Sequence, residues 1–101
     1  MPITSEPALG LAVMQVLAEQ PNYTATVRTL IANVPRHVAL TADDHAPSGT
    51  RPGEEMWEQR VRNLKSHDKT EGNVIGEALV VRVRFGTYRL TAAGRQRLGL
   101  P

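Results

Sequence analysis

Four polar side chains recur at helical spacing near the middle of the chain, and their types suit the edges of nucleic-acid bases: Gln59, Arg62, Asn63 and Ser66. A carboxamide can pair with the N6 donor and N7 acceptor of adenine, and a guanidinium suits the O6 and N7 acceptors of guanine. Gln59 and Asn63 lie four residues apart, so a helix presents both amides on one side. The pattern predicts that these four residues read bases at a site containing adenine; the alternative is that they are simply solvated.

The same amides would also accept N6-methyladenine, because the methylated amino group keeps one hydrogen, provided that an apolar neighbour accommodates the methyl group. Trp57, the only tryptophan, is the candidate for such a methyl-base contact. Its spacing with Val61 and Leu64 instead favours a place in the core, since residues at i, i+4 and i+7 fall on one side of a helix. The core interpretation is the stronger one for Trp57.

These residues require one long amphipathic helix, which the sequence predicts from Glu54 to His67. Pro52 and Gly53 break the preceding chain, and acidic residues at the start of the helix and basic residues toward its end both suit the helix dipole. The apolar side would pack on a core while the polar side projects away from it. This helix is the predicted DNA-reading element, although most amphipathic helices of mixed charge are solvated surface helices.

The basic residues gather in the later half of the chain. Residues 1–50 carry two Arg against four acidic residues, whereas residues 59–101 carry nine Arg or Lys against three acidic residues, within a net charge of +2. Clustered cations favour a polyanionic partner. The side chains predicted to contact the DNA backbone are Arg60, Lys65, His67, Lys69, Arg82, Arg84, Tyr88 and Arg89.

Two helices are predicted before this element. Thr4 or Ser5 caps the first, which extends to Gln20, and a second over residues 24–33 is stopped by Pro35. The first helix carries an apolar stripe of Leu9, Val13, Val16 and Leu17. The remaining segments are predicted as a short extended piece at 36–40, a capped turn at 41–44, and loops at 45–53 and 68–76.

After residue 78 the period of the sequence changes from helical to alternating. An apolar set of Leu79, Val81, Val83 and Phe85 alternates with a second set of Val80, Arg82 and Arg84. A period of two predicts a strand, here with one packed face and one largely cationic face that carries both Arg82 and Arg84 toward phosphates.

The chain then turns and closes. Gly86-Thr87 is predicted to form a two-residue turn, and residues 88–90 return as the partner strand. Phe85 and Tyr88, on either side of the turn, are predicted to be packed, although Tyr88 can also place its hydroxyl on a phosphate. Thr91 caps a short closing helix to Leu98, which glycine at position 94 weakens by about 1 kcal/mol relative to alanine.

The order of these elements predicts an α+β fold, a winged helix-turn-helix with three helices, a C-terminal β-hairpin wing and a short closing helix. With 101 residues, the chain is predicted to form a single domain over residues 1–101. In such a domain the third helix enters the major groove, and the wing contacts the backbone or the minor groove.

Particular motifs also resemble a known family. Pro47-Ser48-Gly49, Trp57 with Leu64 seven residues later, Gly86, and Leu90-Thr91 followed by Gly94-Arg95 resemble the N-terminal winged-helix domain of Mrr-type restriction endonucleases. The block 60–67, then Asn73-Val-Ile and the Gly86-Thr-Tyr-Arg-Leu wing, resembles winged helices attached to nuclease domains of modification-dependent restriction enzymes, including those that require adenine methylation. The resemblance covers about residues 40–98 and departs from the Mrr pattern in the polar stretch 65–77.

The resemblance implies a DNA-targeting module, either a part of a longer protein with a nuclease domain or a free-standing reader, and the sequence leaves open whether a nuclease domain is attached. No nuclease signature occurs in this sequence: neither paired acids with a lysine in a strand nor a histidine-asparagine-histidine metal finger is present. The chain is therefore predicted not to be an enzyme by itself.

Composition restricts the remaining classes of function. The chain has no cysteine and no apolar run near the roughly 18 to 20 residues that span a bilayer. It shows no secretory signal, so we expect a cytoplasmic protein without a membrane partner. No cofactor is expected, and no metal, because His37, His45 and Asp68 follow no recognised ligand spacing. No serine and histidine are spaced as a nucleophile and base.

We therefore expect double-stranded DNA binding, with recognition of methylated DNA, adenine preferred over cytosine, as the targeting module of a restriction system. One alternative is a winged-helix transcriptional regulator, which would bind an unmodified palindrome as a dimer. Another is a winged helix that binds a protein partner and not DNA. The sequence leaves the target sequence, the modified base and the oligomeric state open.

Overall fold

Helix α1 (Glu6–Ala18) opens the computed structural model, which describes residues 2–101. Of the two predicted caps, Thr4 and Ser5, Ser5 is the N-cap, because its side chain accepts a hydrogen bond of 3.2 Å from the backbone N–H of Ala8. The predicted apolar stripe is buried in full: Leu9, Val13, Val16 and Leu17. The helix ends two residues before the predicted Gln20, within the usual uncertainty of a helix end.

The predicted second helix over residues 24–33 is wrong in its first turn. After a 3-10 turn (η1, Pro21–Tyr23), Thr24–Thr26 form a strand, β1, and helix α2 covers only Val27–Asn33. The Thr26 side chain accepts from the Thr29 backbone N–H at 3.3 Å, so Thr26 caps α2 instead of continuing it. Residues 24–26 pair with residues 87–89 of a later strand, a contact that local sequence does not reveal.

The connection from α2 to the next helix runs from residue 34 to residue 55. A 3-10 turn (η2, Val34–Arg36) follows α2, and the extended piece predicted at 36–40 does not form a strand. The turn predicted at 41–44 is confirmed, because the Thr41 hydroxyl accepts the Asp44 N–H at 3.2 Å. The segment 45–53 is irregular, as expected.

The central helix is much shorter than predicted. Helix α3 covers Met56–Arg62, seven residues, instead of residues 54–67. It begins where the Glu55 N–H donates to the Glu58 carboxylate at 2.8 Å. It ends at Asn63, which has φ −100° and ψ 19°. The Leu64 carbonyl then accepts a hydrogen bond of 3.1 Å from the Asn73 amide, and the chain continues to Gly76 in successive turns.

The apolar side of α3 packs as predicted. Trp57, Val61 and Leu64 are all buried, and they join one hydrophobic core with residues from α1, α2 and the hairpin strands. The helix is therefore fixed through the predicted stripe, even though its polar continuation unwinds.

The hairpin is formed by β2 (Val80–Arg84) and β3 (Thr87–Leu90), and β3 also pairs with β1, giving the sheet order β1-β3-β2. Its turn is Phe85-Gly86, one residue earlier than predicted, since Arg84 pairs with Thr87. Gly86 has φ +74°, which a glycine adopts without strain.

The two faces of β2 also differ from the prediction. Leu79 and Val80 are both buried, whereas Val81 is 41% exposed and Phe85 is 93% exposed. The register shifts between Arg82 and Arg84, so a β-bulge at this place interrupts the alternation. The predicted packing of Phe85 is wrong, and that of Tyr88, which is buried, is confirmed.

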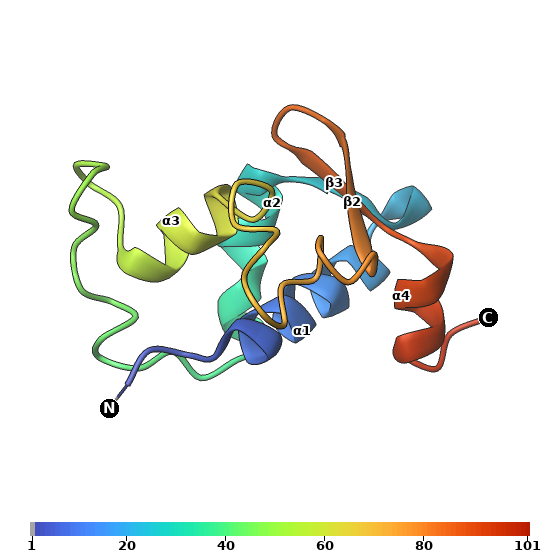
Figure 1. Cartoon of the computed structure of the whole chain (residues 1–101), viewed down its shortest axis with the longest axis horizontal. Helices are drawn as coiled ribbons and strands as arrows, with labels where there is room; N and C mark the ends of the chain where they lie inside the picture. The colour runs from blue at the N-terminus through green and yellow to red at the C-terminus, as the bar shows by residue number, and fades with distance from the viewer. Residues whose placement is uncertain (1) are drawn as a thin grey trace.

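The closing helix α4 (Ala92–Arg97) is confirmed, with the Thr91 hydroxyl accepting the Gly94 N–H at 3.0 Å. The protein is thus a small α+β domain with four α-helices and a three-stranded antiparallel sheet in residues 2–101. Figure 1 shows α3 and α4 on opposite sides of the molecule, with the β2-β3 hairpin extending past the helices. Within residues 2–101, none of the helices has the length and apolar character needed to cross a membrane.

A buried carboxylate ties the start of the chain to the segment before α3. Asp44 is fully buried, and its side chain accepts hydrogen bonds from the Thr4 and Thr41 backbone N–H groups at 2.9 and 2.8 Å. Burial raises the pKa of the Asp44 carboxyl, but hydrogen bonds from Thr4 and Thr41 outweigh it and hold that pKa below its ordinary value of 3.8. The Asp44 carbonyl also accepts the Trp57 N–H at 3.1 Å, which anchors the first turn of α3.

This geometry predicts a specific acid sensitivity. Because the folded pKa lies below the unfolded value, the stabilisation from Asp44 is complete above the ordinary value of 3.8 and is lost as the pH falls through the lowered pKa. We expect Asp44→Asn to reduce the free energy of unfolding at pH 7 by about 1 to 3 kcal/mol. Below pH 3.8, the free energy of unfolding of this variant should depend less on pH than that of the wild type. Urea unfolding between pH 7 and pH 2 measures both effects. The exposed neighbour gives the control, Asp43→Asn, and equal curves for the two variants would contradict the assignment.

Candidate functional site

A cationic cavity of about 350 Å³ lies between the end of α3 and the hairpin. We call it the hairpin cavity. It is lined by Val27, Arg51, Arg62, Asn63, Lys65, Ser66, Arg82, Phe85, Gly86 and Tyr88. Four of these ten residues are Arg or Lys and none is acidic. The cavity therefore combines positive charge, hydrogen-bonding side chains and two aromatic rings, a composition that suits a polyanion carrying flat apolar groups.

The fold assembles this cavity from four separated segments. Val27 comes from the start of α2, Arg51 from the loop before α3, residues 62–66 from the end of α3 and the turns after it, and residues 82–88 from the hairpin. The early end of α3 matters, because the turns after Asn63 let Lys65 and Ser66, adjacent in sequence, both line the same cavity. In a continuous helix, neighbours in sequence would point about 100° apart.

Three of the four predicted base-reading residues meet here, namely Arg62, Asn63 and Ser66. The fourth, Gln59, does not line the cavity. Its side-chain oxygen accepts a hydrogen bond from the Ser48 hydroxyl, which also accepts the Arg51 N–H at 3.1 Å. Gln59 therefore supports the loop before α3, and its amide oxygen is already engaged.

The residues predicted to contact the DNA backbone are divided among several places. Lys65, Arg82 and Tyr88 line the hairpin cavity. Arg60 instead donates to the Thr4 carbonyl at 2.6 Å and to the Glu6 carboxylate at 3.0 Å, and its side chain is only 17% exposed. Arg60 thus fastens α3 to the start of α1.

Two further predicted backbone contacts also lie away from the hairpin cavity. His67 lines a smaller cavity of about 160 Å³ together with Glu6, Arg60 and Thr70. Lys69 is exposed in the turns that follow α3 and lines neither cavity.

Trp57 occupies the core, as the stronger interpretation predicted. It is 5% exposed, and its indole N–H donates to the Glu55 carboxylate at 2.9 Å. This burial leaves no ring face for a methyl-base contact. Val27 and Tyr88, which line the hairpin cavity, are about as buried as Trp57, so the exposed apolar surface there belongs to Phe85.

The cations of the hairpin cavity differ in how far they are neutralised. Arg62 makes two contacts with Glu54 Oε2, of 2.9 Å from Nε and 2.6 Å from Nη2. Lys65 donates to Asp68 at 2.7 Å, and this hydrogen bond lowers the pKa of the Asp68 carboxyl. Arg82 forms no ion pair with any residue from 2 to 101. Among the described residues, Arg82 is therefore the cation of the hairpin cavity whose charge is not neutralised by a carboxylate.

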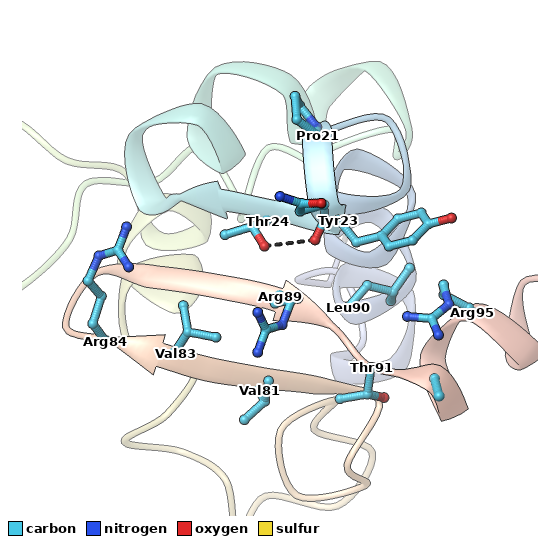
Figure 2. A pocket seen from close by; sticks show the side chains of 12 residues that line it. Pro21, Tyr23, Thr24, Val81, Val83, Arg84, Arg89, Leu90, Thr91 and Arg95 are labelled. Atoms are coloured by element: carbon cyan, nitrogen blue, oxygen red, sulfur yellow. Dashed lines mark hydrogen bonds between the residues drawn. The ribbon is translucent and has the colours of Figure 1, made fainter.

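Arg84 and Arg89 lie on the other side of the sheet. There they line a broad, shallow concavity of about 800 Å³, the outer face, with Val81, Val83 and Arg95 among its other residues. Figure 2 shows Arg84 near the hairpin turn and Arg95 reaching from α4 toward Tyr23, whose ring centroid lies 5.1 Å from the Arg95 guanidinium carbon. The prediction that Arg82 and Arg84 share a face is wrong, because the bulge between them turns them to different sides.

Three residues of the hairpin cavity region were not predicted as functional: Arg51, Glu54 and Phe85. Arg51 and Glu54 stand next to helix-breaking Pro52 and Gly53, so the sequence suggested only a loop and a helix start. For Phe85, the neighbouring Gly86 was a usable sign of a turn, but the alternating pattern placed the side chain in the packed set.

Comparison with known proteins gives no match: no protein-family model, no curated protein and no solved structure is significantly similar to this chain. In residues 2–101, no three His, Asp or Glu side chains gather in a way that could hold a metal ion. Function is therefore to be inferred from the geometry of the chain's own residues.

The pairing of Glu54 with Arg62 predicts how the charge of the hairpin cavity can be raised. Glu54→Gln removes the carboxylate that neutralises Arg62 while leaving an amide oxygen to orient it. We expect this variant to elute from a heparin column at higher salt than the wild type, because Arg62 becomes available to a polyanion.

The matched control is Glu71→Gln, which changes the net charge equally at an exposed position outside the cavity. If both variants shift elution by the same amount, only net charge matters and the hairpin cavity is not the polyanion site.

Proposed function

We propose that this chain is a winged-helix domain that binds double-stranded DNA through the hairpin cavity. The order α1-β1-α2-α3-β2-β3, with β1 joined to the hairpin in one sheet, supports this proposal. In winged helix-turn-helix domains the third helix enters the major groove and the hairpin contacts the backbone or minor groove. The connection 34–55 between α2 and α3 is longer than a usual helix-turn-helix turn, but the two helices still pack together.

The observation that carries the proposal is the convergence of cations from three segments on one cavity that also holds Asn63 and Ser66. Arg82, which is free of ion pairs within residues 2–101, would contact a phosphate first. Arg62 can exchange Glu54 for a guanine edge or a phosphate. Because α3 has seven residues and is about 10 Å long, its reading reaches only a few base pairs.

We further propose that the base read is a methylated one, adenine preferred, and that the domain is the targeting module of a restriction system. The Asn63 amide suits the N6 and N7 positions of adenine. The exposed ring of Phe85 lines the same cavity and can receive a methyl group, a role that buried Trp57 cannot fill. A nuclease domain in the full-length protein would then supply cleavage in the cytoplasm.

The test is a titration of this protein against matched duplexes that are unmodified, contain N6-methyladenine or contain 5-methylcytosine, at about physiological salt. We expect the N6-methyladenine duplex to bind most tightly. Asn63→Ala should remove that preference, at a cost of about 1 to 3 kcal/mol for the lost amide pair.

Arg82→Ala should instead weaken binding to all three duplexes alike and reduce the slope of log K against log salt by about 0.9, the value of one phosphate contact. Arg97→Ala, on the exposed surface of α4, is the matched control and should leave the slope unchanged. Equal affinity for the three duplexes would exclude reading of these marks and favour a transcriptional regulator. Absence of binding would exclude DNA as the partner and favour a protein.

A further inference from the structure

The hairpin turn presents the most exposed large apolar side chain of residues 2–101. Phe85 is 93% exposed, whereas the next most exposed, Ile3, is 48% exposed. Two-residue hairpin turns favour Asn, Asp or Gly, and Phe85 packs on nothing, so neither turn geometry nor the core accounts for a phenylalanine here. Because the fold does not require this phenylalanine, we infer that the side chain contacts a binding partner.

The backbone that carries Phe85 is held firmly. The Gly86 carbonyl accepts a hydrogen bond of 2.9 Å from the Val27 N–H, at the first residue of α2. On the other side of the turn, Arg84 pairs with Thr87. The phenyl ring is therefore presented by a turn that is anchored to a helix, which lowers the entropy lost when the ring is buried in a partner.

The surroundings of Phe85 indicate the chemistry of that partner. The ring borders the hairpin cavity, where Arg82 has no ion-pair partner in residues 2–101, and exposed Arg84 precedes it on the opposite side of the hairpin. Cations on both sides of a single flat apolar ring match two phosphate strands on either side of stacked bases. An apolar protein groove would satisfy the ring but would leave both guanidinium groups without anionic partners.

We propose that Phe85 is a wedge that inserts between adjacent base pairs of bound DNA and unstacks them, while Arg82 and Arg84 hold the flanking phosphates. This inference rests on the proposed DNA binding and deepens it. Insertion of an apolar side chain replaces base–base stacking on one side with base–aromatic stacking and bends the duplex. Steps that unstack easily, such as TpA, would be preferred, so the domain gains selectivity from DNA deformability as well as from base edges.

The experiment uses short duplexes with 2-aminopurine at successive positions around TpA steps, with and without N6-methyladenine, and follows fluorescence at saturating protein. Unstacking of 2-aminopurine increases its emission. We expect an increase at one position with the wild type and its loss in Phe85→Ala, together with about tenfold weaker binding, since one base–aromatic stack is lost. Phe85→Leu should retain part of the increase.

The control is Leu11→Ala, which shortens an exposed apolar side chain on α1 and should behave as the wild type. Circular dichroism checks that each variant is folded. The wedge is wrong, while DNA binding stands, if the wild type binds with normal salt dependence but 2-aminopurine fluorescence increases at no position. The same holds if the fluorescence increases equally with Phe85→Ala. If the wild type binds no duplex even at low salt, the proposed function fails and the wedge fails with it.

Discussion

The arrangement of the molecule depends on the carboxylate of Glu6. One oxygen accepts the Arg60 guanidinium from α3 and the other accepts the Asn73 amide, each at 3.0 Å. Asn73 is 1% exposed and also holds the Leu64 carbonyl and the N–H groups of the turn that follows it. A buried polar network of this kind is costly unless every member is satisfied, so it allows few alternatives. It fixes both where α3 ends and where the chain runs next, and the hairpin cavity is a consequence of that ending.

This constraint divides the basic residues into two groups. Those on and near α3 are engaged: Arg60 holds α1, Arg62 faces Glu54, and Lys65 faces Asp68. Those on the hairpin, Arg82, Arg84 and Arg89, have no ion pair within residues 2–101. Unpaired cations on a projecting element attract a polyanion from a distance. The paired cations at the base of the hairpin can replace their carboxylate partners with phosphates once the polyanion is in contact. If the domain binds DNA as proposed, the hairpin therefore contacts the DNA first, and the residues at the end of α3 form their contacts afterwards.

Sequence periodicity predicted the features that depend on neighbours in the chain: the Ser5 cap and stripe of α1, the packed side of α3, and the Thr91 cap. It missed those that depend on distant partners. Residues 24–26 became a strand because β3 pairs with them, α3 stopped where Asn73 takes the Leu64 carbonyl, and a bulge separated Arg82 from Arg84. Gly94 is a further example. Its sequence context indicates only a less stable α4, but a Cβ at this position would lie 2.2 Å from the Leu79 carbonyl oxygen, so the packing requires glycine.

An NMR titration of the protein's amide resonances with duplex DNA distinguishes the hairpin cavity from the outer face as the binding surface. If the hairpin cavity is the interface, the largest shifts fall on residues 62–66 and on Arg82, Phe85 and Gly86, while residues 21–24 and 92–95 of the outer face stay nearly unchanged. Both sets include basic residues, so general attraction to DNA does not explain such a difference. Shifts concentrated on the outer face, or no shifts at all, would contradict the claim that the end of α3 and the hairpin together form the DNA-binding site.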